Sequence, residues 1–133
     1  MLGLSGEDLL QVWEAGARQR SAERALLLLG AMLREHSREE LANLGIGQRD
    51  AWLLTLRART FGDRMEGFAE CPACGERLEF EVSAAQVLAV VDDEFLVREP
   101  CAETVEIEGY SIQLRLPNGL DLLELSKLRS EEA

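Results

Sequence analysis

The chain has 133 residues, the length of one ordinary domain, and 47% of them are hydrophobic, which is enough to bury a core rather than stay disordered. Its 25 acidic and 14 basic residues give a net charge of −11, which argues against nucleic acid or an anionic membrane as partner, since both need a basic face. No apolar run approaches the roughly 18 residues that span a bilayer and no secretion signal is recognisable, so we expect a soluble cytoplasmic domain.

Two helices are predicted for the first part of the chain. Ser5 is followed three positions later by an acidic residue, which forms a capping box for a helix that ends near Gly16. A second helix is expected from Ser21 to about Glu35. It contains an apolar run at positions 25–29, and a helix that is apolar on every side is typical of the centre of a core.

Two more helices are expected before residue 62. Ser37 begins a capping box for a short third helix, and a fourth spans about 48–60 and stops at Gly62. The buried side of the fourth helix is predicted to hold Trp52, Leu53 and Leu56. We interpret both tryptophans, Trp13 and Trp52, as core residues rather than as a ligand box.

Nothing in this helical part indicates catalysis. His36 is the only histidine and lies beside a helix cap, where imidazole more often interacts with the helix dipole than performs chemistry. A single histidine leaves little room for a Ser-His-Asp or Cys-His site, and the common nucleotide and metalloprotease motifs are absent from the sequence. We therefore predict that the protein is not an enzyme.

The acidic excess is concentrated in one block. Residues 1–65 hold nine acidic and nine basic residues, whereas residues 66–108 hold twelve acidic and two basic ones. Such asymmetry indicates two structural units or one acidic interaction face, or a solvated sheet face that keeps the protein soluble. An acidic interaction face favours protein partners with basic surfaces.

The same block contains the one specific motif, Cys71-Pro72-Ala73-Cys74-Gly75. A strand over 65–70 leads into it, and an alternating strand over 78–82 follows it, as in a zinc knuckle. The tight turn aims two thiolates at one metal while its backbone amides stabilise their charge. A thioredoxin-like dithiol is the weaker interpretation, because that motif begins a helix after a strand.

A structural zinc ion needs four ligands, and this sequence offers two in the motif. Three explanations stay open. Cys101 and one further group complete the site, so that Cys71, Cys74 and Cys101 are its candidate ligands. A partner chain or a further segment supplies the second pair. Or the turn persists without metal, as a simple turn or a disulfide.

The rest of the chain is predicted to add a short helix over 84–90, an acidic loop at 92–94 and a second hairpin that turns at Glu108-Gly109. A last helix spans about 120–129 after Pro117-Asn118-Gly119. The fold class is α+β: a helical part (1–64) packed on a small antiparallel sheet of two hairpins in an acidic β-rich part (65–133), together one compact domain. We expect Leu26 to Leu29 to contact one face of 110–116.

Several segments together resemble one family over nearly the whole chain. They are Gly45-Ile46-Gly47-Gln48-Arg49-Asp50, Leu53-Leu54-Thr55-Leu56-Arg57, Phe61-Gly62, Cys71-Pro72-Ala73-Cys74-Gly75, Gly109-Tyr110, and Leu114-Arg115-Leu116-Pro117-Asn118 leading to Asp121-Leu122-Leu123. The sequence resembles the baseplate proteins of contractile phage tails, in the branch found with phage-tail-like contractile injection systems. That family is similar to the baseplate hub assembly chaperones of contractile-tailed phages.

The resemblance implies a non-enzymatic role in forming the baseplate hub, with other baseplate or tail proteins as partners. It also implies that longer members carry a second C-x-x-C downstream, with Cys71 and Cys74 matching the first pair. Two other functions are kept beside it: a zinc-ribbon-like adaptor in another complex, and a thiol oxidoreductase that uses the dithiol.

Overall fold

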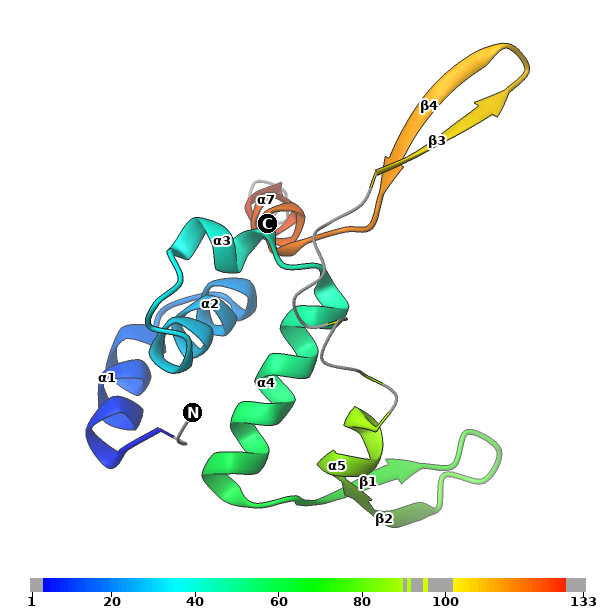
Figure 1. The fold of residues 1–133 in the computed structure, drawn as a ribbon. Coiled ribbons are helices and arrows are strands. Elements are labelled where there is room, and N and C mark those ends of the chain that lie inside the picture. The colour runs from blue at the N-terminus through cyan, green and yellow to red at the C-terminus, as the bar shows by residue number, and fades with distance from the viewer. Residues whose placement is uncertain (1–3, 90, 92–94, 96–101, 129–133) are drawn as a thin grey trace.

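The computed structural model describes residues 4–89, 91, 95 and 102–128. Four helices come first, then a hairpin, a short helix, a second hairpin and a last helix (Figure 1). The elements are α1 (Gly6–Gly16), α2 (Ser21–Met32), α3 (Arg38–Asn43), α4 (Ile46–Phe61), β1 (Arg64–Glu70), β2 (Arg77–Ser83), α5 (Ala84–Leu88), β3 (Ala102–Ile107), β4 (Tyr110–Arg115) and α7 (Gly119–Leu128). The α+β class is confirmed, with the hairpins as two separate antiparallel sheets.

Local capping chemistry explains where the helices begin. The Ser5 hydroxyl accepts from the Asp8 amide at 3.2 Å, and the Ser37 hydroxyl accepts from the Glu40 amide at the same distance, so both predicted capping boxes are confirmed. Helix α2 ends at Met32, earlier than predicted. Helix α4 stops at Gly62, whose φ of 93° is one that glycine adopts without a steric penalty.

The core lies between the helices and is centred on α2. Leu29 is completely buried, and the apolar character of α2 on several sides is explained by neighbours from four other helices, α1, α3, α4 and α7. Leu123 of α7 packs against this cluster as well. The buried cluster consists of Leu26, Leu29, Met32, Leu33, Leu41, Ala42 and Leu56.

The predicted contact between Leu26 to Leu29 and residues 110–116 is wrong. Every residue of β4 is exposed, and α2 instead packs against α1, α3, α4 and α7. Figure 1 shows β3 and β4 extending away from the helices as an arm. The apolar stripe of β4 predicts a core contact because half-buried strands alternate in the same way.

The prediction for Trp13 is also wrong, because its side chain is 77% exposed. Asp8, Leu9, Val12 and Gly16 are the less exposed residues of α1, and their spacing places them on one side of the helix. Trp13 lies beside that stripe rather than on it. Trp52 is partly buried against the core cluster.

Residues 117–119 fasten the last helix to the helical part. The Ile46 amide donates to the Pro117 carbonyl, and the Gly119 amide donates to the Leu44 carbonyl, each at 3.2 Å. A Cβ atom on Gly119 would lie 2.7 Å from the Ala42 carbonyl oxygen, so this close approach requires glycine. Helix α7 therefore belongs to the helical layer in space, although it follows both hairpins in sequence.

Candidate functional site: the β1–β2 hairpin

The first hairpin has two chemically different faces. Residues paired across an antiparallel ladder share a face, and the pairs Met65–Val82, Gly67–Phe80 and Ala69–Leu78 make one face apolar. The pairs on the other face are Arg64–Ser83, Glu66–Glu81, Phe68–Glu79 and Glu70–Arg77. The alternation predicted for the second strand is thus present.

Only the base of the apolar face is covered. Ala84 of α5 is fully buried, and α5 contacts both α4 and the end of β2. Farther out, Leu78 and Phe80 are 52% and 50% exposed. The apolar face of the hairpin is therefore covered near α5 and exposed to solvent in its distal half.

Hydrogen bonds hold the base of this hairpin to the helices. The Asp63 carboxylate accepts hydrogen bonds from the Ser83 hydroxyl at 2.5 Å and from the Ala85 amide at 2.7 Å. Both bonds lower the pKa of Asp63, and the bond from Ser83 has the larger effect. The Arg57 guanidinium donates to the carbonyls of Gly62 and Arg64 across the α4–β1 junction. The direction in which the hairpin leaves α4 is fixed by these contacts.

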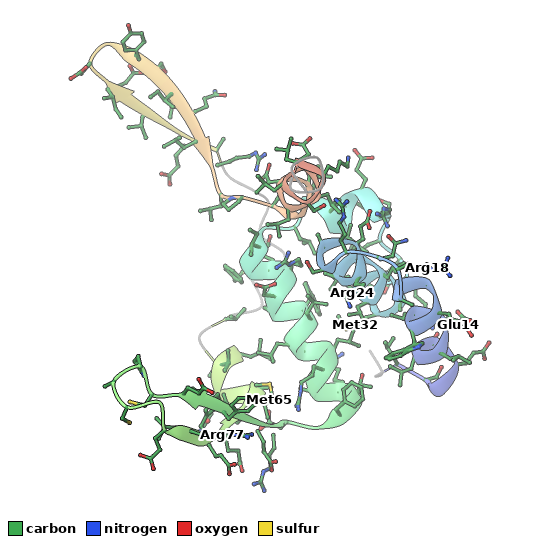
Figure 2. All side chains as sticks on the ribbon, turned by 180° about the vertical axis from the view of Figure 1, so that it is seen from behind. Glu14, Arg18, Arg24, Met32, Met65 and Arg77 are labelled. Atoms are coloured by element: carbon green, nitrogen blue, oxygen red, sulfur yellow. The ribbon has the colours of Figure 1, made fainter. Side chains whose placement is uncertain are left out.

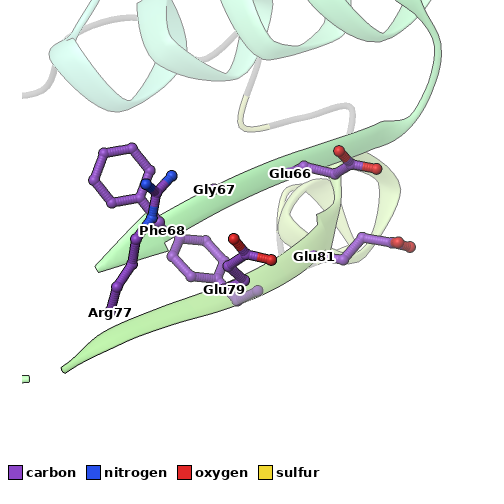
Figure 3. A pocket seen from close by; sticks show the side chains of 7 residues that line it. Glu66, Gly67, Phe68, Arg77, Glu79 and Glu81 are labelled. Carbon is purple, nitrogen blue, oxygen red and sulfur yellow. The ribbon is translucent and has the colours of Figure 1, made fainter. Parts of the chain in front are cut away.

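A shallow depression on the hairpin is lined by residues of both faces (Figure 3). The Arg77 guanidinium lies 4.0 Å from the centre of the Phe68 ring, which is a cation–π contact. Glu66 and Glu81 face each other across the ladder, and Arg64 forms an ion pair with Glu81. The lining residues are Glu66, Gly67, Phe68, Arg77, Glu79, Phe80 and Glu81.

The depression is lined by three carboxylates and by two phenyl rings from opposite faces of the ladder. Two of these groups already hold a cation of the chain itself, because Arg77 lies over Phe68 and Arg64 pairs with Glu81. Sequence reasoning missed this depression. The Phe80 ring lies against Gly67, where a Cβ atom would come within 2.7 Å of the ring. The signal was available in principle, because a glycine paired with an aromatic residue across two strands invites this packing.

The tip of the hairpin is the Cys71-Pro72-Ala73-Cys74-Gly75 turn. The Cys71 amide donates to the Glu76 carbonyl at 2.9 Å, and the Gly75 amide donates back to the Cys71 carbonyl at 2.8 Å. Gly75 has a φ of 73°, as expected for the residue that closes such a turn. Cys71 and Cys74 are both free thiols, Cys74 being exposed.

The turn stabilises negative charge on one sulfur. The amides of Ala73 and Cys74, followed by the Cys74 thiol, hydrogen-bond the Cys71 sulfur and lower the pKa of its thiol. Cys71 follows β1 and leads toward β2, which differs from the helix N-terminus of a thioredoxin-like site. The lowered pKa favours the thiolate form of Cys71.

The structure brings together two of the three predicted metal ligands. Cys101 lies outside the described residues, so the set of Cys71, Cys74 and Cys101 stays a prediction. His36 is exposed near the end of α2, and within the described part of the chain no three His, Cys, Asp or Glu side chains gather as a metal site. The predicted acidic loop at 92–94 also lies outside the described residues.

Comparison with known protein families decides which group of proteins this arrangement belongs to. A family model described as T4 bacteriophage base plate protein matches residues 7–133. The chain belongs to this baseplate family. The match includes all of the hairpin site and confirms the baseplate relationship expected from the sequence. Comparisons with curated proteins and with solved structures gave no match.

Membership of the baseplate family gives the hairpins a structural context. Among the described residues, no helix is both long and apolar enough to cross a membrane. The exposed features of this baseplate protein are instead short strands with apolar side chains and carboxylates. Surfaces of that composition suit contacts with other proteins.

Proposed function

We propose that this chain is a non-enzymatic component of a contractile tail baseplate, and that it acts by binding other baseplate or tail proteins during assembly. The observation that carries the proposal is the open distal half of the β1–β2 hairpin, in a chain that belongs to a baseplate family. Leu78 and Phe80 offer apolar area there, and the opposite face offers carboxylates for a basic partner.

An assembly role of the chaperone kind is the finer form of this proposal. A chaperone must hold a partner that finally goes elsewhere, and small exposed patches suit reversible binding better than a large obligate interface does. The fixed base formed by Asp63 and Arg57 lets the hairpin present its patch in one direction. A subunit that stays in the particle uses the same contacts permanently.

Site-specific photocrosslinking tests the proposal. A photoreactive residue at position 78 on the apolar face is expected to capture tail or baseplate proteins in cells that assemble tails. The same residue at position 85, an exposed site on α5, serves as the matched control. Capture of only unrelated proteins at position 78 contradicts the proposal. Presence of the chain in purified tails identifies a subunit, and absence identifies an assembly factor.

A second candidate function is a zinc-ribbon-like adaptor, with zinc as a structural ion. The observation that favours it is the donation of two backbone amides to the Cys71 sulfur, which fits half of a tetrahedral thiolate site. Bound zinc would hold four ligands together, and this turn would supply Cys71 and Cys74. The second pair comes from Cys101 with another group, from a further segment, or from another chain.

Metal titration of the full chain tests the zinc proposal. Cobalt is used as the spectroscopic probe, and zinc as its competitor. The adaptor proposal predicts thiolate-to-cobalt absorption that disappears in a Cys71→Ser, Cys74→Ser double variant. Loss in Cys101→Ser assigns the third ligand, whereas one metal for two chains indicates a second copy. Equal absorption in the double variant and the unchanged chain contradicts the proposal.

A further inference from the structure

The β3–β4 hairpin is an amphipathic arm that the helices do not cover. Its ladder pairs Val105 with Ile112 and Ile107 with Tyr110, which places four apolar side chains on one face. The opposite face carries the polar pairs Thr104–Gln113 and Glu106–Ser111. We name the first set, together with Leu114, the arm face.

The arm face is open to solvent. Tyr110 is 72% exposed and Leu114 is 53% exposed, and Figure 2 shows the side chains of this hairpin standing clear of the helical part. In the described part of the chain, β3 and β4 pair only with each other. An isolated two-stranded hairpin is marginally stable in water, so an apolar face of this kind gains stability when a partner covers it.

The charges around the arm face indicate which partner fits. Residues 102–116 contain three acidic residues, Glu103, Glu106 and Glu108, and one basic residue, Arg115. Arg115 is already engaged, because its guanidinium donates to both carboxylate oxygens of Asp121 at 2.6 and 2.7 Å. Glu106 lies on the opposite face, so Glu103, which pairs with Leu114, and Glu108 in the turn are the two carboxylates that a cationic partner could meet at the arm face.

The same charges disfavour the other occupants. A second copy of the arm would bring its own Glu103 and Glu108 against these, and like charges across an interface are unfavourable. An anionic membrane or a nucleic acid would meet the same repulsion. A protein segment with apolar side chains and flanking lysine or arginine residues satisfies both the apolar face and the carboxylates.

We propose that the arm face is a docking site for an apolar, lysine- or arginine-bearing segment of another protein. This inference rests on the proposed function and adds the position and chemistry of one interface. The segment lies against Val105, Ile107, Tyr110, Ile112 and Leu114, and its cations face Glu103 and Glu108. The Arg115–Asp121 ion pair connects the base of the arm to α7.

Tyr110 makes the proposal directly measurable because it is the only tyrosine in the chain. Tyrosine labelled with carbon-13 gives one set of NMR signals, which reports on the arm face in the full-length protein. The probe is a synthetic peptide with alternating leucine and lysine, and a peptide with alternating leucine and glutamate is its control. The Tyr110 signals are expected to shift with the first peptide and to stay unchanged with the second.

Two single substitutions separate the arm face from general charge effects. Ile112→Lys places a cation on the arm face, and Gln113→Lys places the same cation on the opposite face one residue away. We expect the response to the peptide to be lost in Ile112→Lys and kept in Gln113→Lys. An equal response to both peptides, or a response that survives in Ile112→Lys, overturns the proposal.

Two further outcomes have defined meanings. If the Tyr110 signals change with protein concentration alone, the partner of the arm face is a second copy of the chain. If they change on addition of phosphatidylglycerol vesicles, the partner is a membrane. Either result overturns the proposal. A silent Tyr110 in a chain that still crosslinks tail proteins at position 78 refutes the arm face and leaves the baseplate role standing. Tyr110 signals that respond to the peptide in a chain that forms no such crosslinks support the arm face and refute the baseplate role.

Discussion

Because the helical core is buried and the β3–β4 arm is uncovered, the same substitution at one leucine of each should lower the free energy of unfolding by very different amounts. Leu29 is completely buried in the helical cluster, whereas Leu114 on β4 is 53% exposed. Truncating a buried leucine to alanine leaves a cavity and costs about 3 kcal/mol or more. Truncating a leucine that is half exposed on a marginal hairpin should cost less than about 1 kcal/mol.

Urea and thermal unfolding, followed by far-ultraviolet circular dichroism, measure the difference. For a domain of this size about 1 kcal/mol corresponds to roughly 4 °C in Tm, so we expect Leu29→Ala to lower Tm by roughly 12 °C. Leu114→Ala should lower it by at most about 4 °C. Equal losses in the two variants would refute the reasoning, because they would mean that the chain covers β4 with its own residues.

Three further predictions concern single contacts. Gly119→Ala should lower the free energy of unfolding in urea by about 1–3 kcal/mol, because the new Cβ atom would lie 2.7 Å from the Ala42 carbonyl oxygen. Gly6→Ala is the control, since Gly6 has open space around it. Equal stability of the two variants would contradict the packing of Gly119 on Ala42. Hydrogen bonds from Arg115 lower the pKa of Asp121 from 3.8 to about 2, so its contribution to the free energy of unfolding is complete above the unfolded pKa and disappears as pH falls through about 2. Urea unfolding between about pH 5 and about pH 2 should therefore show a loss that Asp121→Asn lacks, and parallel profiles would disprove the assignment. In a Cys74→Ser, Cys101→Ser variant, the rate at which iodoacetamide labels Cys71 should rise with pH and reach its midpoint below pH 9.0. The backbone amides at positions 73 and 74 are still present and lower the pKa of the Cys71 thiol. A midpoint at or above pH 9.0 would remove the proposed support for a metal thiolate.

Local sequence signals predicted most elements, because each depends on residues that are close in the chain. Ser5 and Ser37 cap their helices through residues three positions later, and the positive φ angles of Glu108 and Gly109 form the predicted turn between β3 and β4. The Cys71 turn likewise needs only its own five residues and a closing strand pair. These features could be read before any tertiary contact was known.

What the sequence could not supply was the partner of each apolar surface. The alternation in 110–116 predicts a face that avoids water, but it does not say whether the chain or another protein covers that face. Leu123 in α7 covers α2 instead, and this depends on the approach of Gly119 to Ala42 between segments distant in sequence. The contact of Arg77 with Phe68 is set by strand register, which composition does not reveal.

The most direct test of the baseplate role is to count assembled contractile tails by electron microscopy after deletion of the gene in a strain that produces them. The baseplate role predicts that assembled tails are lost and that the unchanged chain, supplied in trans, restores them. It also predicts that the Gln113→Lys variant restores them and the Ile112→Lys variant does not. Normal numbers of complete tails in the deletion strain would contradict the baseplate role, whatever the two variants do.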